Sequence, residues 1–389
     1  MKMDMPERLK QKWKSAKAEK YTLRAMTTPY LTPIVLLVIA TSAAAQRASV
    51  PPAPPLPTAA VQSESRNRLP LLKPGVEGVE AIRLHASGVD VRWLSPLGRD
   101  LTELAILTAA REHDQPYEWS LHEMEALAVG LDPKIIDVVR HRRPTTGLPD
   151  KPAAIIELGR ETFGKHALSS ATYTRALNAL GKTNLVDIVI LIANYAATAT
   201  RLTAFNQQMP PGWKQFLPLP FTPPDDIHAD TKSRLPYVKA QAAAMPGPMY
   251  SRGLAPEGTG PGLINRHGTG MKMLEAGVGR RTMALAVLVT SHEHHQPYHW
   301  ARSEAMARKD GVEPALIDVV RENKPLTGLD ENDAAVVQFG RELFRNHTVT
   351  PATYQRALKA FGQRNLVDLV DLMARTVNDL TLLTAFDQR

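Results

Sequence analysis

The 389-residue sequence contains no cysteine. This absence excludes disulfide bonds, thiolate nucleophiles, thiolate metal ligands and CxxC redox pairs. It also excludes the reduction of peroxides by a thiol, because that reaction needs a thiolate to attack the peroxide oxygen. A site in this chain can move protons through carboxyl and imidazole groups, but it cannot carry out thiol chemistry.

Outside the N-terminus the basic residues are nearly balanced by acidic ones. The formal net charge is +8, but residues 1–45 carry +5 of it, which leaves +3 for all the others. No basic stripe interleaved with aromatic residues appears in that remainder, so we expect no nucleic-acid partner. The glycine-rich segment 258–262 is not a phosphate-binding loop either, because it lacks the lysine and the strand–turn–helix setting of such loops.

A long apolar run is also missing, and the short one near the N-terminus has a specific context. Residues 33–40 (PIVLLVIA) follow a basic segment and precede an A-x-A pattern that ends at Ala45. This order predicts a signal peptide over residues 1–45, with Met26 as an alternative start. We therefore expect an exported, periplasmic or secreted protein with no stable membrane insertion after cleavage. The alternative is an uncleaved membrane anchor, although a bilayer span needs about 20 residues.

One segment of the chain occurs twice. Residues 111–208 align with residues 292–389 at a constant offset of 181 without a gap, and 47 of these 98 positions are identical. The two copies must therefore share a fold. An RLP string, at Arg68 and again at Arg234, is expected to open each copy. We predict a Pro-rich linker over residues 46–64, a first domain over 65–224 and a second, degenerate domain over 225–389.

Apolar residues inside each copy recur at helical spacing, and strand-like alternation is missing. In residues 184–205, for example, Leu185, Ile188 and Ile192 fall on one helical face. Gly181 fits a helix end, and Ser169 or Ser170 fits the N-cap of a helix. The pattern predicts an all-α fold of two modules with about six helices each.

A carboxylate and an imidazole form the leading candidate site. Glu118 and His122 are four residues apart, so a helix places them on one face. A carboxylate beside an imidazole can orient the ring, raise its pKa and share a proton with it. Glu103 lies on the preceding helix, whose apolar face is expected to pack here, so we expect it to point into the same pocket. The alternative interpretation is a solvated helix face.

The segments around these residues resemble a known family. TELAIL (102–107) and AAREHDQPYEWSLHEMEALAVGL (109–131) look like the carboxymuconolactone decarboxylase family, which includes the alkylhydroperoxidase D-like proteins. Peroxidase-type members carry two cysteines, a histidine and an upstream glutamate. By spacing, the cysteines fall on Gln115 and Glu118, the histidine on His122 and the glutamate on Glu103. The resemblance therefore implies the cysteine-free decarboxylase branch, which uses no metal or organic cofactor.

On this resemblance we expect an alkylhydroperoxidase D-like helical fold and a cofactor-free lyase acting on a small carboxylated or lactone-type substrate. The expected catalytic residues are Glu103, Glu118 and His122. The expected substrate-binding residues are Arg111, Gln115, Tyr117 and Trp119. Arg111 would neutralise a substrate carboxylate, although a surface arginine is the plainer interpretation. Modules of this family oligomerise, so we expect a trimer of tandem chains. Two alternatives stay open: a non-catalytic binding or assembly protein, and a lactone hydrolase.

The second copy has lost most of the candidate site. At the fixed offset Glu103 becomes Ala284, Glu118 becomes His299 and His122 becomes Ser303, and of the four site positions only Gln115 persists, as Gln296. We therefore expect the second copy to be structural or regulatory.

Histidines gather at the start of one helix in the second copy. His295 and His299 are spaced like two metal ligands on one helical face, but no third ligand stands at motif spacing. We expect a solvent-exposed histidine cluster there and no metal. His166 and His347 occupy the same position in the two copies, so a fold role is expected for them.

Overall fold

A computed structural model describes residues 67–210, 212–217, 226–239 and 258–388. The predicted signal peptide, the linker over residues 46–64 and the predicted domain boundary between residues 224 and 225 lie outside the described residues. All described residues belong to one compact unit, Pro55–Arg389.

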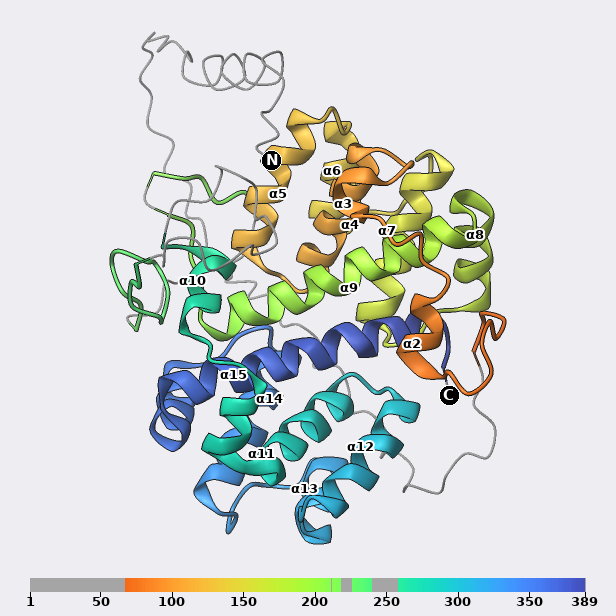
Figure 1. The fold of residues 1–389 in the computed structure, drawn as a ribbon. Helices are drawn as coiled ribbons and strands as arrows, with labels where there is room; N and C mark the ends of the chain where they lie inside the picture. Colours follow the sequence, from red (N-terminus) through yellow and green to blue (C-terminus); the bar gives the residue numbers. More distant parts are fainter. Residues whose placement is uncertain (1–66, 211, 218–225, 240–257, 389) are drawn as a thin grey trace, which may run out of the picture. The chain divides into compact units, whose positions relative to one another are not determined.

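The described residues form helices joined by short loops (Figure 1). The first copy contains α2 (Gly78–Arg83), α3 (Val91–Leu94), α4 (Arg99–Glu112), α5 (Pro116–Ala128), α6 (Pro133–Arg140), α7 (Asp150–Gly164), α8 (Ser170–Leu180) and α9 (Lys182–Ala204). The second contains α10 (Gly260–His267), α11 (Met271–Glu293), α12 (Pro297–Lys309), α13 (Pro314–Arg321), α14 (Glu331–Arg345) and α15 (Pro351–Ala385). Within the described ranges there is no strand, only an isolated bridge between His228 and Ser233. The all-α prediction is confirmed.

Matching side chains start the corresponding helices of the two copies. The side chain of Gln115 caps α5 by accepting a hydrogen bond from the backbone N–H of Tyr117 at 2.8 Å, and Gln296 caps α12 in the same way. Such a cap satisfies backbone donors that the first helical turn leaves unpaired. Gly181 separates α8 from α9 with a φ of 76°, and its counterpart Gly362 bends α15 with a φ of 70°.

Helices α9 and α15, each the last helix of its copy, pack along each other at the centre of this unit (Figure 1). Among the described residues, α9 alone is long and apolar enough to cross a membrane, but 83% of its most apolar stretch is buried in the protein. The central helix of a helical core is buried in the same way. Around this pair, α4 packs against α5, α7 and α9, while α11 packs against α12, α14 and α15.

The RLP strings cross between the copies in a reciprocal way. The backbone N–H of Arg68 donates to the carbonyl of Phe386 at 2.9 Å, and that of Arg234 donates to the carbonyl of Phe205 at 2.9 Å. Phe386 and Phe205 occupy equivalent positions at the ends of α15 and α9. Each copy is therefore closed by the opening segment of the other, as expected when two related modules pack about an approximate twofold axis.

Candidate functional site

Two of the three predicted catalytic residues are in direct contact. Glu103 on α4 and His122 on α5 meet where these helices pack, with Glu103 Oε2 2.7 Å from His122 Nδ1. Their exposed fractions are 0% and 3%. Because a carboxylate accepts the hydrogen bond, Nδ1 carries the proton and Nε2 keeps a lone pair when the ring is neutral. Nε2 has no hydrogen-bond partner among the described residues.

Two arginines hold the Glu103 carboxylate from the other side. Arg92 Nε donates to Glu103 Oε1 at 3.2 Å, and Arg99 donates to the same oxygen at 2.5 Å. Both arginines also bind Glu125 on α5, Arg99 at 3.1 Å. Two guanidinium groups and two carboxylates balance in charge, which makes their joint burial tolerable. The Arg92 guanidinium in turn lies 5.9 Å from the centre of the Tyr195 ring.

Glu118 lies on the same helix but does not bind His122. Its exposed fraction is 2%, and neither carboxyl oxygen has a hydrogen-bond partner among the described residues. The predicted Glu118–His122 pair is therefore wrong in its partner, because the His122 ring turns to Glu103 on the neighbouring helix. The rings of His122 and Tyr195 pack edge to face, with their centres 4.9 Å apart.

The environment shifts the pKa values of the two carboxyl groups in opposite directions. Burial by itself would raise the pKa of Glu103, but His122, Arg92 and Arg99 outweigh burial and hold that pKa at about 2. Burial raises the pKa of Glu118 well above its usual range, and the charge of Arg92 only partly opposes this rise. The site therefore keeps Glu103 ionised at neutral pH and shifts Glu118 toward its protonated form.

Two of the predicted binding residues are tied into the scaffold. Arg111 Nε donates to the carbonyl of Arg140 at 2.7 Å, and Arg111 also forms an ion pair with Asp114. The side-chain oxygen of Gln115 caps α5, and its side-chain N–H donates to the hydroxyl of Thr203 at 3.1 Å. Gln115 meets the predicted catalytic residues only at the backbone N–H of Glu118, which donates to its side-chain oxygen at 3.5 Å as part of the cap.

The two predicted aromatic binding residues are buried elsewhere. Trp119 donates through its indole N–H to Glu123 at 2.8 Å, and the second copy repeats this bond between Trp300 and Glu304. Repetition in the copy that lacks the site indicates a scaffold role. Tyr117 reaches the second copy, where its hydroxyl lies 3.1 Å from the hydroxyl of Thr259.

One group of side chains at the site has the geometry of metal ligands. Glu103, His122 and Glu125 each offer a ligating atom, and these atoms lie within 4.8 Å of one another. However, Arg92 and Arg99 already bind both carboxylates. A cation would have to displace two guanidinium groups, so this donor set fits an ion-pair network better than a metal site.

The equivalent position in the second copy is filled by a different network. His299 Nδ1 lies 2.7 Å from the hydroxyl of Ser291 and 3.0 Å from that of Ser303. Burial, followed by Arg302 and His294, lowers the pKa of His299 to about 4.

The expectation of a solvent-exposed histidine cluster is wrong. His292 is buried and donates a hydrogen bond through Nε2 to the carbonyl of Arg321 at 3.1 Å. His294 and His295 are only partly exposed, because the first copy packs over them.

Sequence reasoning missed four members of the site: Arg92, Arg99, Glu125 and Tyr195. A signal for three of them exists in the comparison of the two copies. At the same offset Arg92, Glu125 and Tyr195 become Met273, Met306 and Thr376, so they change together with Glu103, Glu118 and His122, whereas Arg99 persists as Arg280. Joint replacement of these six residues in one copy indicates that they work as one set.

Comparisons with models of protein families, with curated proteins and with solved structures found no match to this chain.

Proposed function

We propose that the first copy carries a cofactor-free acid–base site that acts on a small carboxylated or lactone-type substrate. The observation that carries this proposal is the buried 2.7 Å contact between Glu103 and the His122 imidazole, with a second buried carboxyl group, Glu118, one turn away on the helix of His122. The pKa of Glu103 is lowered and that of Glu118 is raised. Pairs of titratable groups whose pKa values are pushed apart are typical of sites that combine an acid with a base.

We propose one role each for His122, Glu103 and Glu118. His122 Nε2 is the base that accepts a proton from the substrate, and Glu103 stabilises the resulting imidazolium through the 2.7 Å contact at Nδ1. Glu118 is the acid that returns a proton. If the reaction is a decarboxylation, loss of carbon dioxide leaves an electron pair on a substrate carbon, and the proton from Glu118 neutralises it.

The substrate class is inferred from charge and from resemblance. Arg92 is the cation that acts on the buried Glu118, so a substrate placed beside Glu118 would meet a guanidinium suited to a carboxylate. The similarity of residues 102–131 to the carboxymuconolactone decarboxylase family supports a lactone bearing a carboxylate. It also supports two alkylhydroperoxidase D-like modules, of which the second has lost the site.

Access to the site requires a movement. The three proposed catalytic side chains are at most 3% exposed. The short helix α3 carries Arg92 into the site and places Trp93 under Arg99, whose guanidinium lies 3.9 Å from the ring centre. A four-residue helix is the smallest described element at the site, so we propose that α3 opens to admit substrate.

The test is a screen of the mature chain against small lactones and carboxylated lactones. We expect His122→Ala to lower turnover by at least about a hundredfold, the usual contribution of a positioned acid or base. Glu118→Gln should act similarly, because an amide cannot deliver a proton. His299→Ala, a buried histidine on the equivalent helix α12, is the matched control and should keep turnover. Unchanged turnover in His122→Ala, with helical content preserved, would contradict the proposal.

Two other functions are separated by the same screen. A lactone hydrolase would use His122 to activate water and would release a ring-opened hydroxy acid without carbon dioxide. A non-catalytic binding or assembly protein is favoured by the closed Arg92–Glu103–Arg99–Glu125 network, which is neutral and buried as a structural cluster would be. That function predicts binding without turnover.

The proposal extends to location and assembly. Residues 1–45 predict export, which sequencing of the N-terminus of the mature protein would test. A trimer of tandem chains follows from the family resemblance alone. Light scattering on the purified protein should show three chains per particle, and a monomer would remove this part of the proposal.

A further inference from the structure

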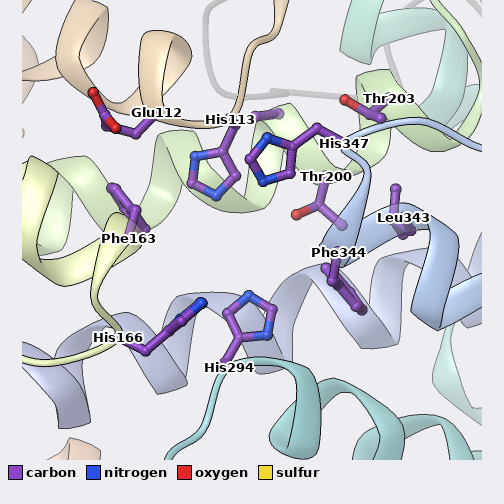
Figure 2. A pocket seen from close by; sticks show the side chains of 11 residues that line it. Glu112, His113, Phe163, His166, Thr200, Thr203, His294, Leu343, Phe344 and His347 are labelled. Carbon is purple, nitrogen blue, oxygen red and sulfur yellow. The ribbon is translucent and has the colours of Figure 1, made fainter. Parts of the chain in front are cut away.

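A small cavity lies between the two copies, away from the acid–base site. Its volume is about 50 Å³, and four histidines line it: His113, His166, His294 and His347 (Figure 2). At the fixed offset, His294 is the counterpart of His113 and His347 the counterpart of His166. Each copy therefore contributes the same two histidines to one space.

The rings pair across the interface between the copies. The centres of the His113 and His347 rings are 5.7 Å apart, and those of the His166 and His294 rings are 5.8 Å apart. Figure 2 shows one pair on each side of the cavity, with Phe163 and Phe344 beside them. Two imidazoles bound to one ion at about 2.0–2.1 Å have ring centres roughly 5–6 Å apart, so either pair has the required spacing.

The hydrogen bonds of two rings leave a lone pair for a ligand. His113 Nδ1 lies 3.0 Å from the carbonyl of Ala109, and His294 Nδ1 lies 2.8 Å from the carbonyl of Thr290. A carbonyl only accepts, so Nδ1 carries the proton in both rings and Nε2 has the lone pair. In both rings Nε2 lacks a hydrogen-bond partner among the described residues. A backbone carbonyl bound to the other nitrogen is the usual support of a metal-ligating histidine.

Burial keeps three of the four rings, His113, His166 and His294, neutral at physiological pH. Burial lowers the pKa of His113 to about 3, with further contributions from His347 and His294. Burial lowers the pKa of His294 to about 4 and that of His166 well below its usual range. Neutral imidazole is the form that binds transition metals, so no proton has to leave these three rings before an ion binds.

We propose that this cavity binds one divalent transition-metal ion of the zinc, copper or nickel class through His113, His166, His294 and His347. Imidazole nitrogen is a preferred ligand of these ions. A volume of about 50 Å³ admits an ion together with water, which needs about 10–15 Å³ of such space. Because the ligands come from both copies, the ion would tie the copies together.

The rings must move slightly to reach a common ion. Among the described residues, only Glu103, His122 and Glu125 bring three ligating atoms within 4.8 Å of one another, and arginines already bind those carboxylates. The histidine nitrogens lie farther apart. The cavity between the two pairs leaves room for side-chain rotation (Figure 2), and the Asp114 carboxylate lies 3.7 Å from His347 Nδ1.

The test measures Zn²⁺ binding to the full, tag-free chain by equilibrium dialysis, with the melting temperature recorded in Zn²⁺ and in chelator. His166→Asn and His347→Asn remove one imidazole from each copy. Both positions have a φ of 49°, a left-handed conformation that asparagine tolerates, so both variants are expected to fold. Two controls are His141→Ala, at a half-exposed surface histidine, and Glu125→Gln, in the other group of possible ligands.

We expect one Zn²⁺ per chain, a rise in melting temperature on binding, and an affinity at least about tenfold lower in each asparagine variant. Both controls should bind as the wild type does. Absence of stoichiometric binding, binding kept in both asparagine variants, or binding lost in Glu125→Gln would each overturn the proposal. Should the variants fail to fold, pulsed electron paramagnetic resonance of the Cu²⁺-loaded wild type decides, and a spectrum without imidazole nitrogen coupling overturns it.

Discussion

Two glutamates on α5 show how the same residue type serves different ends. Glu123 accepts hydrogen bonds from Trp119 and Arg140, at 2.8 and 2.7 Å, so its burial is compensated. Glu118 is buried with no hydrogen-bond partner among the described residues. A buried polar group without a partner costs about 1–3 kcal/mol. A protein keeps such a cost most readily where the group has a chemical task.

Replacing these two glutamates with methionine should therefore have opposite effects on stability. Glu118→Met removes an uncompensated polar group, and we expect it to raise the free energy of unfolding by about 1–3 kcal/mol. Glu123→Met removes the acceptor of the buried Trp119 N–H and leaves the partly exposed Arg140 guanidinium with only Asp137, 3.6 Å away, and we expect a loss of about 1–3 kcal/mol. Chemical denaturation of both variants measures the difference. A destabilised Glu118→Met protein would show that Glu118 has a partner in solution.

The gain from Glu118→Met should depend on pH. Burial raises the pKa of Glu118 in the folded chain, whereas the unfolded chain keeps the usual value of about 4.5. The folded state thus holds the proton over a pH range in which the unfolded state has released it, so this residue lowers stability as pH rises above about 4.5. The difference between variant and wild type should be small at pH 4 and larger at pH 8. A pH-independent difference would contradict the raised pKa.

At the scale of elements, a glycine lets two helices approach closely in each copy. A Cβ added to Gly159 on α7 would lie 2.5 Å from Thr108 on α4, and one added to Gly340 on α14 would lie 2.5 Å from Val289 on α11. Contacts this short force a side chain or backbone to shift. Since α4 carries Glu103, the close packing of α7 against α4 also helps to position the proposed acid–base site.

We expect Gly159→Ala to lower the free energy of unfolding by about 1–3 kcal/mol, although alanine has the higher helix propensity. Gly164→Ala on the same helix is the control, because its added Cβ meets nothing within 4 Å and the second copy carries Arg345 there. The control should be neutral or stabilised by up to about 1 kcal/mol. Thermal unfolding of both variants is the measurement, and equal effects would show that the close crossing does not exist in solution.

At the scale of the whole described unit, the two copies depend on each other. The side chain of Arg234 is 1% exposed and donates to the carbonyls of Ala204 in one copy and Val349 in the other, at 3.2 and 2.8 Å. It also binds Asp226 at 2.7 Å. Arg68 makes the reciprocal bridge from the first copy, with a 2.6 Å bond to the carbonyl of Leu168. Shared closure of this kind predicts that the copies unfold together.

Arg234→Ala should lower the free energy of unfolding by about 3–5 kcal/mol, because it leaves Asp226 and two carbonyls without their buried donor. We expect calorimetry to show one transition at a lower temperature, since the copies share an interface. Arg68→Ala should have a smaller effect, because its side chain is 15% exposed. Two separate transitions in either variant would mean that the copies are independent domains.

Several features could be predicted from the sequence because they depend on local spacing or on internal comparison. Helical periodicity and helix-end residues such as Gly181 and Ser169 predicted the all-α fold, since these signals act within a few residues. The fixed offset of 181 predicted that Glu103, Glu118 and His122 stand apart from the scaffold. Proximity of Glu103 and His122 followed from the packing of adjacent amphipathic helices.

Only the tertiary structure decided which partners meet across long separations. Spacing along α5 favoured Glu118 as the partner of His122, but the packing angle of α4 brought Glu103 to the ring and left Glu118 unpaired. No local pattern shows that His166 of one copy faces His294 of the other, or that Arg68 and Arg234 cross between copies. Local sequence sets which face of a helix is apolar, whereas the packing of whole helices sets which polar groups are enclosed together.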